Sequence, residues 1–237
     1  MTWGVGVVVP ARDEAERLRA CLDALRAAIA QIGLPASHCH VVVVADDCHD
    51  DTAAMARRAL VEWGEVIEID AGSAGAARAA GVAVLLRRMS AVAPERLWLL
   101  TTDADTIVPC DWLDAHLRWA RAGAVAAAGV VRVDSFDEHP SVVAERFTAI
   151  YDGPLDQEHP HVHAANLGVR ADVYAAVGGW RAVASGEEHH LWRAVRDLGL
   201  AMVSPRSLQV TTSARATSRV RGGFADWLLE LAALEVS

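Results

Sequence analysis

The first hundred residues alternate between two kinds of segment. Short runs of apolar, mostly β-branched residues occur at Val5–Val9, Val41–Val44, Val66–Ile69 and Leu97–Leu100. Between them lie longer runs with apolar residues at helical spacing, at Glu14–Ile32, Thr52–Trp63 and Ala76–Arg88. Strands joined by helices form β-α-β units, whose crossovers place parallel strands in a sheet with helices on both faces. The pattern therefore predicts an α/β fold with a mostly parallel central sheet.

The regular alternation ends after Asp105. We expect helices at Trp112–Arg121, Ser141–Tyr151, Ala171–Val177, Glu187–Leu198 and Phe224–Leu234. Extended segments are predicted at Val125–Val133, Asn166–Val169 and Met202–Thr211. The stretch Asp152–His163 has two prolines, one glycine and three histidines, which is typical of a mobile loop. No repeat or linker divides the sequence, so we predict one domain over residues 1–237.

Composition excludes several classes of protein. Of the 237 residues, 53% are apolar and 22% charged, which is enough apolar surface for a core and excludes general disorder. The net charge of −9 leaves no broad basic face, so nucleic acid is not an expected partner. All 22 cationic side chains are arginine, typical of a GC-rich bacterial genome. Without lysine, the chain cannot form a Schiff base or a P-loop.

The cysteines and the apolar segments indicate a compartment. Cys21, Cys39, Cys48 and Cys110 have neither paired nor zinc-binding spacing, so we expect reduced, mostly buried thiols. We find no signal peptide pattern, and the longest apolar runs are shorter than the roughly 20 residues of a membrane helix. We therefore expect a cytoplasmic protein without a transmembrane segment, and leave a homodimer open as its assembly.

Acidic residues follow two of the predicted strands directly. Asp46 and Asp47 end the second strand, and Asp103-Ala104-Asp105 follows the fourth. In open parallel sheets, ligands bind at the carboxyl ends of the strands. Two carboxylates at this spacing can approach one Mg²⁺ or Mn²⁺, whose coordination substrate phosphates usually complete. The alternative is a polar turn, but the position directly after an apolar strand favours a metal site.

Seven short motifs together resemble one enzyme family. They are Val7–Glu14, Asp46–Thr52, Gly75–Gly81, Asp103–Asp105, Ala165–Arg170, Gly178–Trp180 and Gly186–Glu188. Each motif alone is weak, but their order and spacing over nearly the whole chain resemble the family 2 glycosyltransferases. This resemblance implies the GT-A fold, a Rossmann-like α/β/α sandwich. It also implies a nucleotide-sugar-binding half at residues 1–105 and an acceptor-binding half at residues 106–237.

The resemblance implies roles for residues of the first half. Those expected around the donor nucleotide are Pro10, Ala11, Arg12, Glu14, Asp46, Arg78 and Asp103. Asp46 would accept a hydrogen bond from the base, commonly uracil, whereas Asp50 is assigned to capping the next helix. Helix capping is also the alternative for Asp46 itself, and for Arg78 the alternative is an arginine on the helix surface.

The same resemblance implies a divalent cation, Mn²⁺ or Mg²⁺. Asp105 is the expected principal ligand, and Asp103 binds ribose hydroxyls or metal-bound water. Related enzymes often add a histidine nearer the C-terminus, where this chain has Thr211-Thr212-Ser213. Metal binding by His161 or His163 is possible on spacing, but a loop that covers the acceptor is the preferred reading of the histidine segment. Arg215, Arg219 and Arg221 could close over the diphosphate or form a solvated basic turn.

The second half carries the candidate catalytic residues. Glu187-Glu188 resembles the Glu-Asp pair of the family, whose second member is the base that removes a proton from the acceptor hydroxyl. Because the second residue here is Glu, either one could be the base. The alternative is that both acids favour the dipole of a helix N-terminus. Candidate acceptor or lid residues are His163, Asn166, Trp180 and His189. Trp180 could stack on a sugar ring or belong to the core.

The resemblance implies an inverting, metal-dependent glycosyltransferase. It would move one sugar from a nucleotide-diphosphate sugar, by default a UDP-sugar, to a hydroxyl acceptor. The Q-x-x-R-W motif of processive synthases is absent from the sequence, as are their membrane helices, which favours single transfer. One alternative is a non-catalytic protein that binds nucleotide sugars. A sugar nucleotidyltransferase is less favoured, because such enzymes use a glycine-rich first loop and essential lysines.

Overall fold

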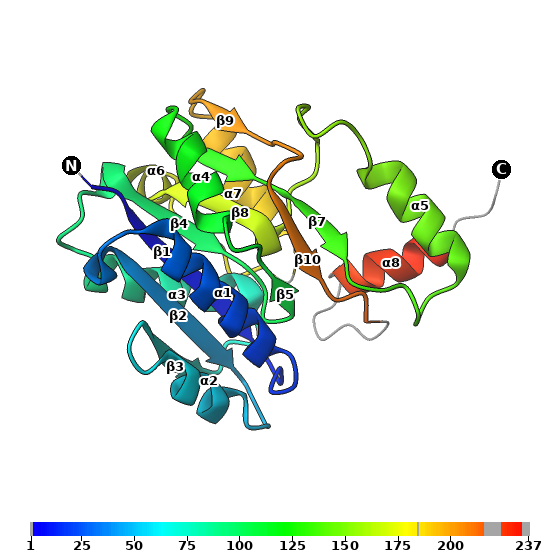
Figure 1. Cartoon of the computed structure of the whole chain (residues 1–237), viewed down its shortest axis with the longest axis horizontal. Helices are drawn as coiled ribbons and strands as arrows, with labels where there is room; N and C mark the ends of the chain where they lie inside the picture. Colours follow the sequence, from blue (N-terminus) through cyan, green and yellow to red (C-terminus); the bar gives the residue numbers. More distant parts are fainter. Residues whose placement is uncertain (1, 184, 216–223, 234–237) are drawn as a thin grey trace.

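The computed structural model describes residues 2–183, 185–215 and 224–233 and is centred on a seven-stranded sheet (Figure 1). The strand order is β3-β2-β1-β4-β8-β6-β9. The strands are β1 (Gly4–Ala11), β2 (Cys39–Asp46), β3 (Gly64–Ile69), β4 (Leu97–Thr101), β6 (Ala126–Ala128), β8 (Leu167–Arg170) and β9 (Met202–Val203). Strands β1 to β4 are parallel, β8 runs antiparallel to β4 and β6, and β9 is parallel to β6. The predicted α/β fold with a mostly parallel sheet is confirmed.

Helices cover both faces of this sheet. They are α1 (Leu18–Ile32), α2 (Thr52–Leu60), α3 (Ala74–Arg88), α4 (Trp112–Arg121), α6 (Ala171–Ala176) and α7 (Glu187–Arg196). Two further helices, α5 (Ser141–Tyr151) and α8 (Phe224–Ala233), lie to one side of it (Figure 1). Alternate residues of a strand point to opposite faces. In β2, Val41 and Val43 pack with residues of α1, α2 and α4, whereas Val42 and Val44 pack with residues of α3, α6 and α7. The apolar runs are therefore strands buried on both faces.

A second, three-stranded sheet was not predicted. It has the order β5-β10-β7 and consists of β5 (Thr106–Ile107), β7 (Val130–Val133) and β10 (Gln209–Thr212). The predicted single strand Val125–Val133 is wrong, because the chain leaves one sheet at Gly129 and joins the other. A Cβ on Gly129 would lie 2.1 Å from Nδ2 of Asn166 and 2.5 Å from the carbonyl oxygen of Leu208, so only glycine fits there. The predicted extended segment Met202–Thr211 is likewise divided between the two sheets.

The other predicted elements differ mainly at their ends. Helix α1 begins at Leu18 rather than Glu14, whose N–H donates to Oγ1 of Thr52 at 2.8 Å instead of lying in a helical turn. Asn166 lies in a 3₁₀ turn, Ala164–Asn166, directly before β8. The segment Asp152–His163 contains no helix, only an isolated bridge from Glu158 to Pro205, which agrees with the predicted loop. Two further 3₁₀ turns, Ala36–His38 and Pro94–Arg96, precede β2 and β4.

The segments after β7 build a separate wall beside the sheets. Helices α5 and α8 lie against each other, beyond the edge formed by β7 and β10 (Figure 1). The four cysteines are unpaired thiols, with Cys21 and Cys39 buried, Cys48 half-buried and Cys110 exposed. In the described parts of the chain, no helix has both the length and the apolar composition that crossing a membrane requires.

Candidate active site

A cavity of about 690 Å³ opens at the carboxyl ends of β1, β2 and β4. It brings together most of the residues predicted from the sequence. Those on its wall are Pro10, Ala11, Arg12, Glu14, Asp46, Arg78, Asp103, Asp105, His163, Glu187, Glu188 and His189. The position agrees with the rule that ligands of open parallel sheets bind beyond the carboxyl ends of the strands.

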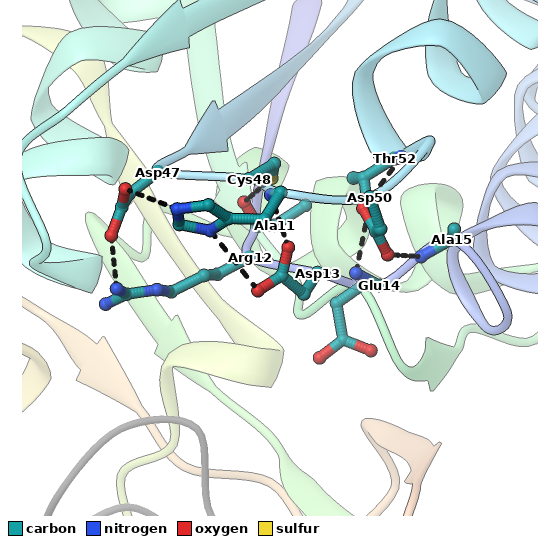
Figure 2. A network of polar contacts seen from close by, with 10 residues as sticks. Ala11, Arg12, Asp13, Glu14, Ala15, Asp47, Cys48, Asp50 and Thr52 are labelled. Carbon is teal, nitrogen blue, oxygen red and sulfur yellow. Dashed lines mark hydrogen bonds and ion pairs between the residues drawn. The ribbon is translucent and has the colours of Figure 1, made fainter.

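The loops after β1 and β2 are tied to each other by polar contacts (Figure 2). The Arg12 guanidinium forms an ion pair with Asp47, and the N–H of Ala15 donates to Oδ2 of Asp50 at 3.1 Å. Asp13 and Asp47 have φ values of 50° and 53°, a left-handed conformation that, apart from glycine, asparagine and aspartate, few residues adopt. The contacts hold both loops in these conformations at the edge of the cavity.

Asp46 organises the loop that leads into α3. Its Oδ1 accepts hydrogen bonds from the N–H groups of Ala71 at 2.7 Å and Gly72 at 3.0 Å, and its Oδ2 accepts one from Ser73 at 3.0 Å. The residue is 4% exposed, although it reaches the cavity wall. Its contact with a nucleotide base stays a prediction. The N-cap of α2 is Asp51 rather than the predicted Asp50, and the side chain of Asp51 makes no capping hydrogen bond. Oδ1 of Asp50, one residue earlier, accepts from the N–H of Thr52 at 2.9 Å.

Arg78 is a buried connection between three elements. Its Nε donates to Oγ1 of Thr101 at 3.1 Å, its Nη2 to Oδ1 of Asp103 at 2.6 Å, and its Nη1 to Oε1 of Glu187. The side chain is only 4% exposed, so the alternative of a surface arginine is wrong. Burial by itself lowers the pKa of Arg78. The negative charges of Asp103 and Glu187 raise it by more, so the pKa lies above its ordinary value. Nucleotide contact by Arg78 stays a prediction.

The N-terminus of α3 approaches α7 closely at Gly75. A Cβ there would lie 2.1 Å from the carbonyl oxygen of Arg181 and 3.2 Å from Cβ of Glu187. A side chain at this position would therefore push α7 away from α3. Gly75 allows the two helices to approach until Arg78 can reach Glu187.

Asp105 is a nearly buried carboxylate that pairs with Arg215. Its Oδ2 lies 3.2 Å from Nη2 of Arg215, and Oγ1 of Thr212 donates to its Oδ1 at 3.4 Å. The other amino group of Arg215, Nη1, lies 2.7 Å from Oε1 of Glu14. Burial raises the pKa of Asp105 to about 6, although Arg215 opposes this shift. The carboxylates of Asp105 and Glu14 therefore gain from a positive charge between them, which Arg215 supplies.

The donor atoms at this place suit a divalent cation. Asp103 and Asp105 both present hard carboxylate oxygens to the cavity, and substrate phosphates and water commonly complete the coordination of Mg²⁺ or Mn²⁺. Within the described residues, the group with three ligand atoms within 4.8 Å of one another is instead Asp13, Cys48 and Asp50, and the two aspartates belong to no such group. A cation at Asp105 must also displace Arg215.

The two candidate histidine ligands have other partners. Nε2 of His163 lies 2.6 Å from the hydroxyl of Tyr151, and Nε2 of His161 lies 3.3 Å from the carbonyl oxygen of Ile150. Both side chains belong to an aromatic cluster rather than to the carboxylates. These contacts favour the interpretation of residues 152–163 as a loop that covers the acceptor over the alternative that its histidines bind a metal.

Glu187 and Glu188 occupy the first turn of α7 but have different surroundings. Glu187 is 7% exposed and pairs with Arg78. The side chain of Glu188 is 19% exposed, and its Oε1 lies 3.7 Å from Nε2 of His189. Burial raises the pKa of Glu188, and the charge of Glu187 raises it further. The carboxylate of Glu188 is thus available to a ligand, whereas that of Glu187 is held by an arginine.

Two predicted acceptor residues do not line the cavity. Asn166 is fully buried, where it accepts from Nε1 of Trp112 at 2.9 Å and donates to the carbonyl oxygens of Val130 and Leu208. It joins the strands where the two sheets meet. Trp180 is 8% exposed and packs in the core, with Cζ of Arg78 5.4 Å from its ring centre. These contacts correct both assignments. Of the predicted arginine cluster, Arg219 and Arg221 lie outside the described residues.

Sequence reasoning missed the apolar part of the cavity wall. Ile150 and Tyr151 from α5 and Phe224 and Trp227 from α8 all line it. The two helices are more than 70 residues apart in sequence, and no motif links them. The one sequence signal near this part of the wall is the proline- and histidine-rich segment after α5. Its composition predicts a loop over the acceptor site, but it does not indicate which aromatic residues pack against that loop.

Comparison with models of protein families shows to which family this chain belongs. The model of Glycosyl transferase family 2 matches residues 6–195, which is most of the chain. The chain belongs to this family. The match covers the loops after β1 and β2 and the glutamates of α7, whereas Thr212, Arg215, Phe224 and Trp227 of the cavity wall lie beyond the matched range. A comparison with curated proteins gave no match.

Several solved structures are similar to this family 2 chain. The mannosyltransferase PcManGT from Pyrobaculum calidifontis, in complex with GDP-Man and Mn²⁺, is 18% identical over 96% of this chain and 60% of its own, with a TM-score of 0.68. S. aureus TarS 1-349 in complex with UDP-GlcNAc is 14% identical over 97% of this chain and 65% of its own, with a TM-score of 0.66. Glucosyl-3-phosphoglycerate synthase from Mycobacterium tuberculosis, with Mn²⁺, UDP and glucosyl-3-phosphoglycerate, is 16% identical over 98% of this chain and 76% of its own, at 0.52. The chain thus spans less than two thirds of the first two structures, and the likeness shows the GT-A fold.

Proposed function

We propose that this chain transfers one sugar from a nucleotide-diphosphate sugar to a hydroxyl acceptor, with inversion at the anomeric carbon. One observation carries the proposal: Asp103, Asp105 and Glu188 line the same cavity at the carboxyl ends of the strands. The first two suit a cation beside a diphosphate, and the third suits proton removal. Membership of family 2 and the sugar nucleotides in two similar structures support it.

The donor would bind in the half formed by residues 1–105. The loops after β1 and β2 and the N-terminus of α3 surround this part of the cavity. Similar structures hold GDP-Man and UDP-GlcNAc, and we take a UDP-sugar as the default donor because the family commonly recognises uracil. Asp103 and Asp105 would hold Mn²⁺ or Mg²⁺. The bound cation would stabilise the negative charge that develops on the leaving nucleoside diphosphate.

Glu188 is the base in this proposal. Its carboxylate accepts the proton of the acceptor hydroxyl while that oxygen forms a bond to the anomeric carbon. The bond from this carbon to the diphosphate oxygen breaks on the opposite side, and its electron pair leaves with the nucleoside diphosphate. A raised pKa makes Glu188 a better proton acceptor near neutral pH than an ordinary glutamate. Glu187, held by Arg78, orients the first turn of α7.

Transfer from UDP- and GDP-sugars, measured with and without Mn²⁺, tests the proposal. The anomeric configuration of the product, read by NMR, tests inversion. Glu188→Gln should lower kcat by about 10²–10⁴-fold while nucleotide affinity changes little. Glu187→Gln is the matched control, because it removes the neighbouring charge and should act on stability as well as on rate. Retention of configuration, or full activity of Glu188→Gln, would contradict the assignment.

A further inference from the structure

One part of the cavity wall has no role in donor binding or in proton removal. It consists of Ile150 and Tyr151 at the end of α5, Val162 in the following loop, and Phe224 and Trp227 in α8. The ring centres of Tyr151 and Trp227 lie 5.7 Å apart, and those of Phe224 and Trp227 also 5.7 Å apart. We call these five residues the aromatic wall. The three rings contact one another, and Ile150 and Val162 line the same cavity.

The aromatic wall is supported from behind by stacked rings. Tyr151 stacks on Phe147 with ring centres 4.3 Å apart, and on its other side the ring of His161 lies 4.3 Å away. Tyr151 is therefore fixed, and its hydroxyl is taken by His163. By contrast, Phe224 and Trp227 are only half-buried, and Ile150 is 38% exposed. A ligand that covers apolar side chains left partly open in a concave site removes their surface from water, which favours binding.

The titratable side chains of the aromatic wall and of the neighbouring histidine loop are uncharged at neutral pH, while the nearby Arg206 donates to the carbonyl oxygen of Tyr151 at 2.6 Å. Burial lowers the pKa of His163 to about 3 and that of His159 to about 4, and it raises the pKa of Tyr151. None of these side chains therefore carries a charge to balance one on a ligand. Glu188, His189 and His163 line the same cavity as the aromatic wall.

The described cationic groups of the cavity are already paired. Arg12 pairs with Asp47, Arg78 with Asp103 and Glu187, and Arg215 with Asp105 and Glu14. An anionic acceptor on the aromatic wall would lose its hydration without gaining a partner among the described residues, and it would also meet the negative charges of Glu187 and Glu188. Burial of an unpaired charge is costly, whereas burial of an apolar group is favourable.

We propose that the acceptor has an uncharged, apolar body, aromatic or hydrocarbon, which packs against the aromatic wall and presents its hydroxyl to Glu188. This inference rests on the proposed function, because it names the acceptor class of the same site. It contrasts with the phosphoglycerate group present in one of the similar structures. Trp227 and Ile150 become specificity-determining residues, since both are partly open and they lie on different helices, α8 and α5.

Calorimetric binding with four probe compounds tests the inference without requiring turnover. With UDP and Mn²⁺ present, 4-nitrophenyl β-glucoside should bind at least tenfold more tightly than methyl β-glucoside, and octyl β-glucoside should also exceed the methyl compound. 3-Phosphoglycerate should bind most weakly. Equal or tighter binding of methyl glucoside or 3-phosphoglycerate would overturn the inference, as would the absence of binding by both apolar glucosides.

Variants on the aromatic wall make the same test specific to its residues. Trp227→Ala should weaken binding of 4-nitrophenyl glucoside about tenfold and leave UDP binding unchanged. The control on the same helix is Leu229→Ala, which is 45% exposed and lies off the cavity. If Trp227→Ala fails to fold, Ile150→Asp provides a second test at a partly exposed position, and it should also weaken binding of 4-nitrophenyl glucoside. Its control is Leu155→Asp, in the loop that follows α5. An unchanged affinity in Ile150→Asp would contradict the inference.

Measurements with the donor alone distinguish a failure of the acceptor inference from a failure of the proposed function. UDP-sugar binding and hydrolysis without acceptor test the proposed function alone. If the donor is bound and hydrolysed but apolar probes do not bind, only the acceptor inference fails. If neither donor turnover nor nucleotide binding occurs, the proposed function itself fails.

Discussion

Nη2 of Arg78 lies 2.6 Å from Oδ1 of Asp103, and the side chain of Arg78 is only 4% exposed. The same guanidinium donates to Glu187 on α7. One buried cation therefore joins the aspartate motif after β4 to the helix that carries the proposed base. Because arginine holds two carboxylates in a fixed planar geometry, it can set the distance between the donor side and the acceptor side of the cavity.

Substitution of Arg78 should affect both stability and rate. Arg78→Ala leaves two carboxylates without their cation, which should cost on the order of 3 kcal/mol of unfolding free energy. Arg78→Lys keeps the charge but cannot bridge Asp103 and Glu187, so we expect partial recovery of stability with a low kcat. Urea unfolding and transfer kinetics measure the two effects. The control is Arg88→Ala, on the same helix as Arg78, which breaks an exposed ion pair with Glu65 of β3. It should cost less than about 1 kcal/mol of unfolding free energy. Equal costs in Arg78→Ala and Arg88→Ala would refute the bridging role.

The rate of transfer should depend on the ionisation of Glu188. A base must be deprotonated, and the pKa of Glu188 is raised by burial and by Glu187, so kcat/KM should fall on the acid side at a pH above the ordinary 4.5 of glutamate. A pH–rate profile measures this. Glu188→Asp should keep an acid limb with a lower rate, whereas Glu188→Gln should lose the limb together with the activity. The same acid limb in Glu188→Gln would assign it to another group.

Removal of Arg215 should make the fold depend on divalent cations. Arg215→Met leaves the carboxylates of Asp105 and Glu14 without their shared cation, and we expect a loss of the order of 3 kcal/mol. Mn²⁺ should then raise Tm more in this variant than in the wild type, because the ion no longer competes with a guanidinium. Thermal unfolding with and without Mn²⁺ measures the difference. Arg132→Met, which breaks a partly exposed pair with Asp152, should respond like the wild type. A common Mn²⁺ response in all three proteins would exclude this competition.

Stability should fall on acidification because His116 is buried. Burial lowers the pKa of His116 to about 4 from 6.5, so between these values the unfolded chain binds the proton and the folded protein does not. The contribution is fully present above pH 6.5 and is lost as the pH falls towards 4, on the order of 3 kcal/mol in total.

Urea unfolding between pH 4 and 7 should show this slope. His116→Gln should reduce it, while the exposed His190→Gln should leave it unchanged. An identical slope in His116→Gln and the wild type would show that other groups cause the pH dependence.

Much of the first half could be predicted from the sequence for a local reason. A buried parallel strand such as Val41–Val44 must be apolar on both faces, and the following helix must carry its apolar residues at helical spacing, so adjacent residues contain the information. The acids at Asp46 and Asp103 follow from the same pattern, because they stand where a strand ends. Pairing partners are not local. That Arg78 is buried against Trp180, and that Trp180 is a core residue, depends on segments 100 residues apart.

By itself, the sequence determined the strands and helices of the first half and the positions of the acids, since periodicity and strand ends are properties of neighbouring residues. Only the tertiary structure decided which acid is available: Arg78 holds Glu187 and leaves Glu188 open to the cavity. It also decided that a strand divides at Gly129 and that α5 and α8 together form an aromatic wall. These outcomes depend on contacts between distant segments, whose geometry is fixed only when the two sheets and their helices pack together.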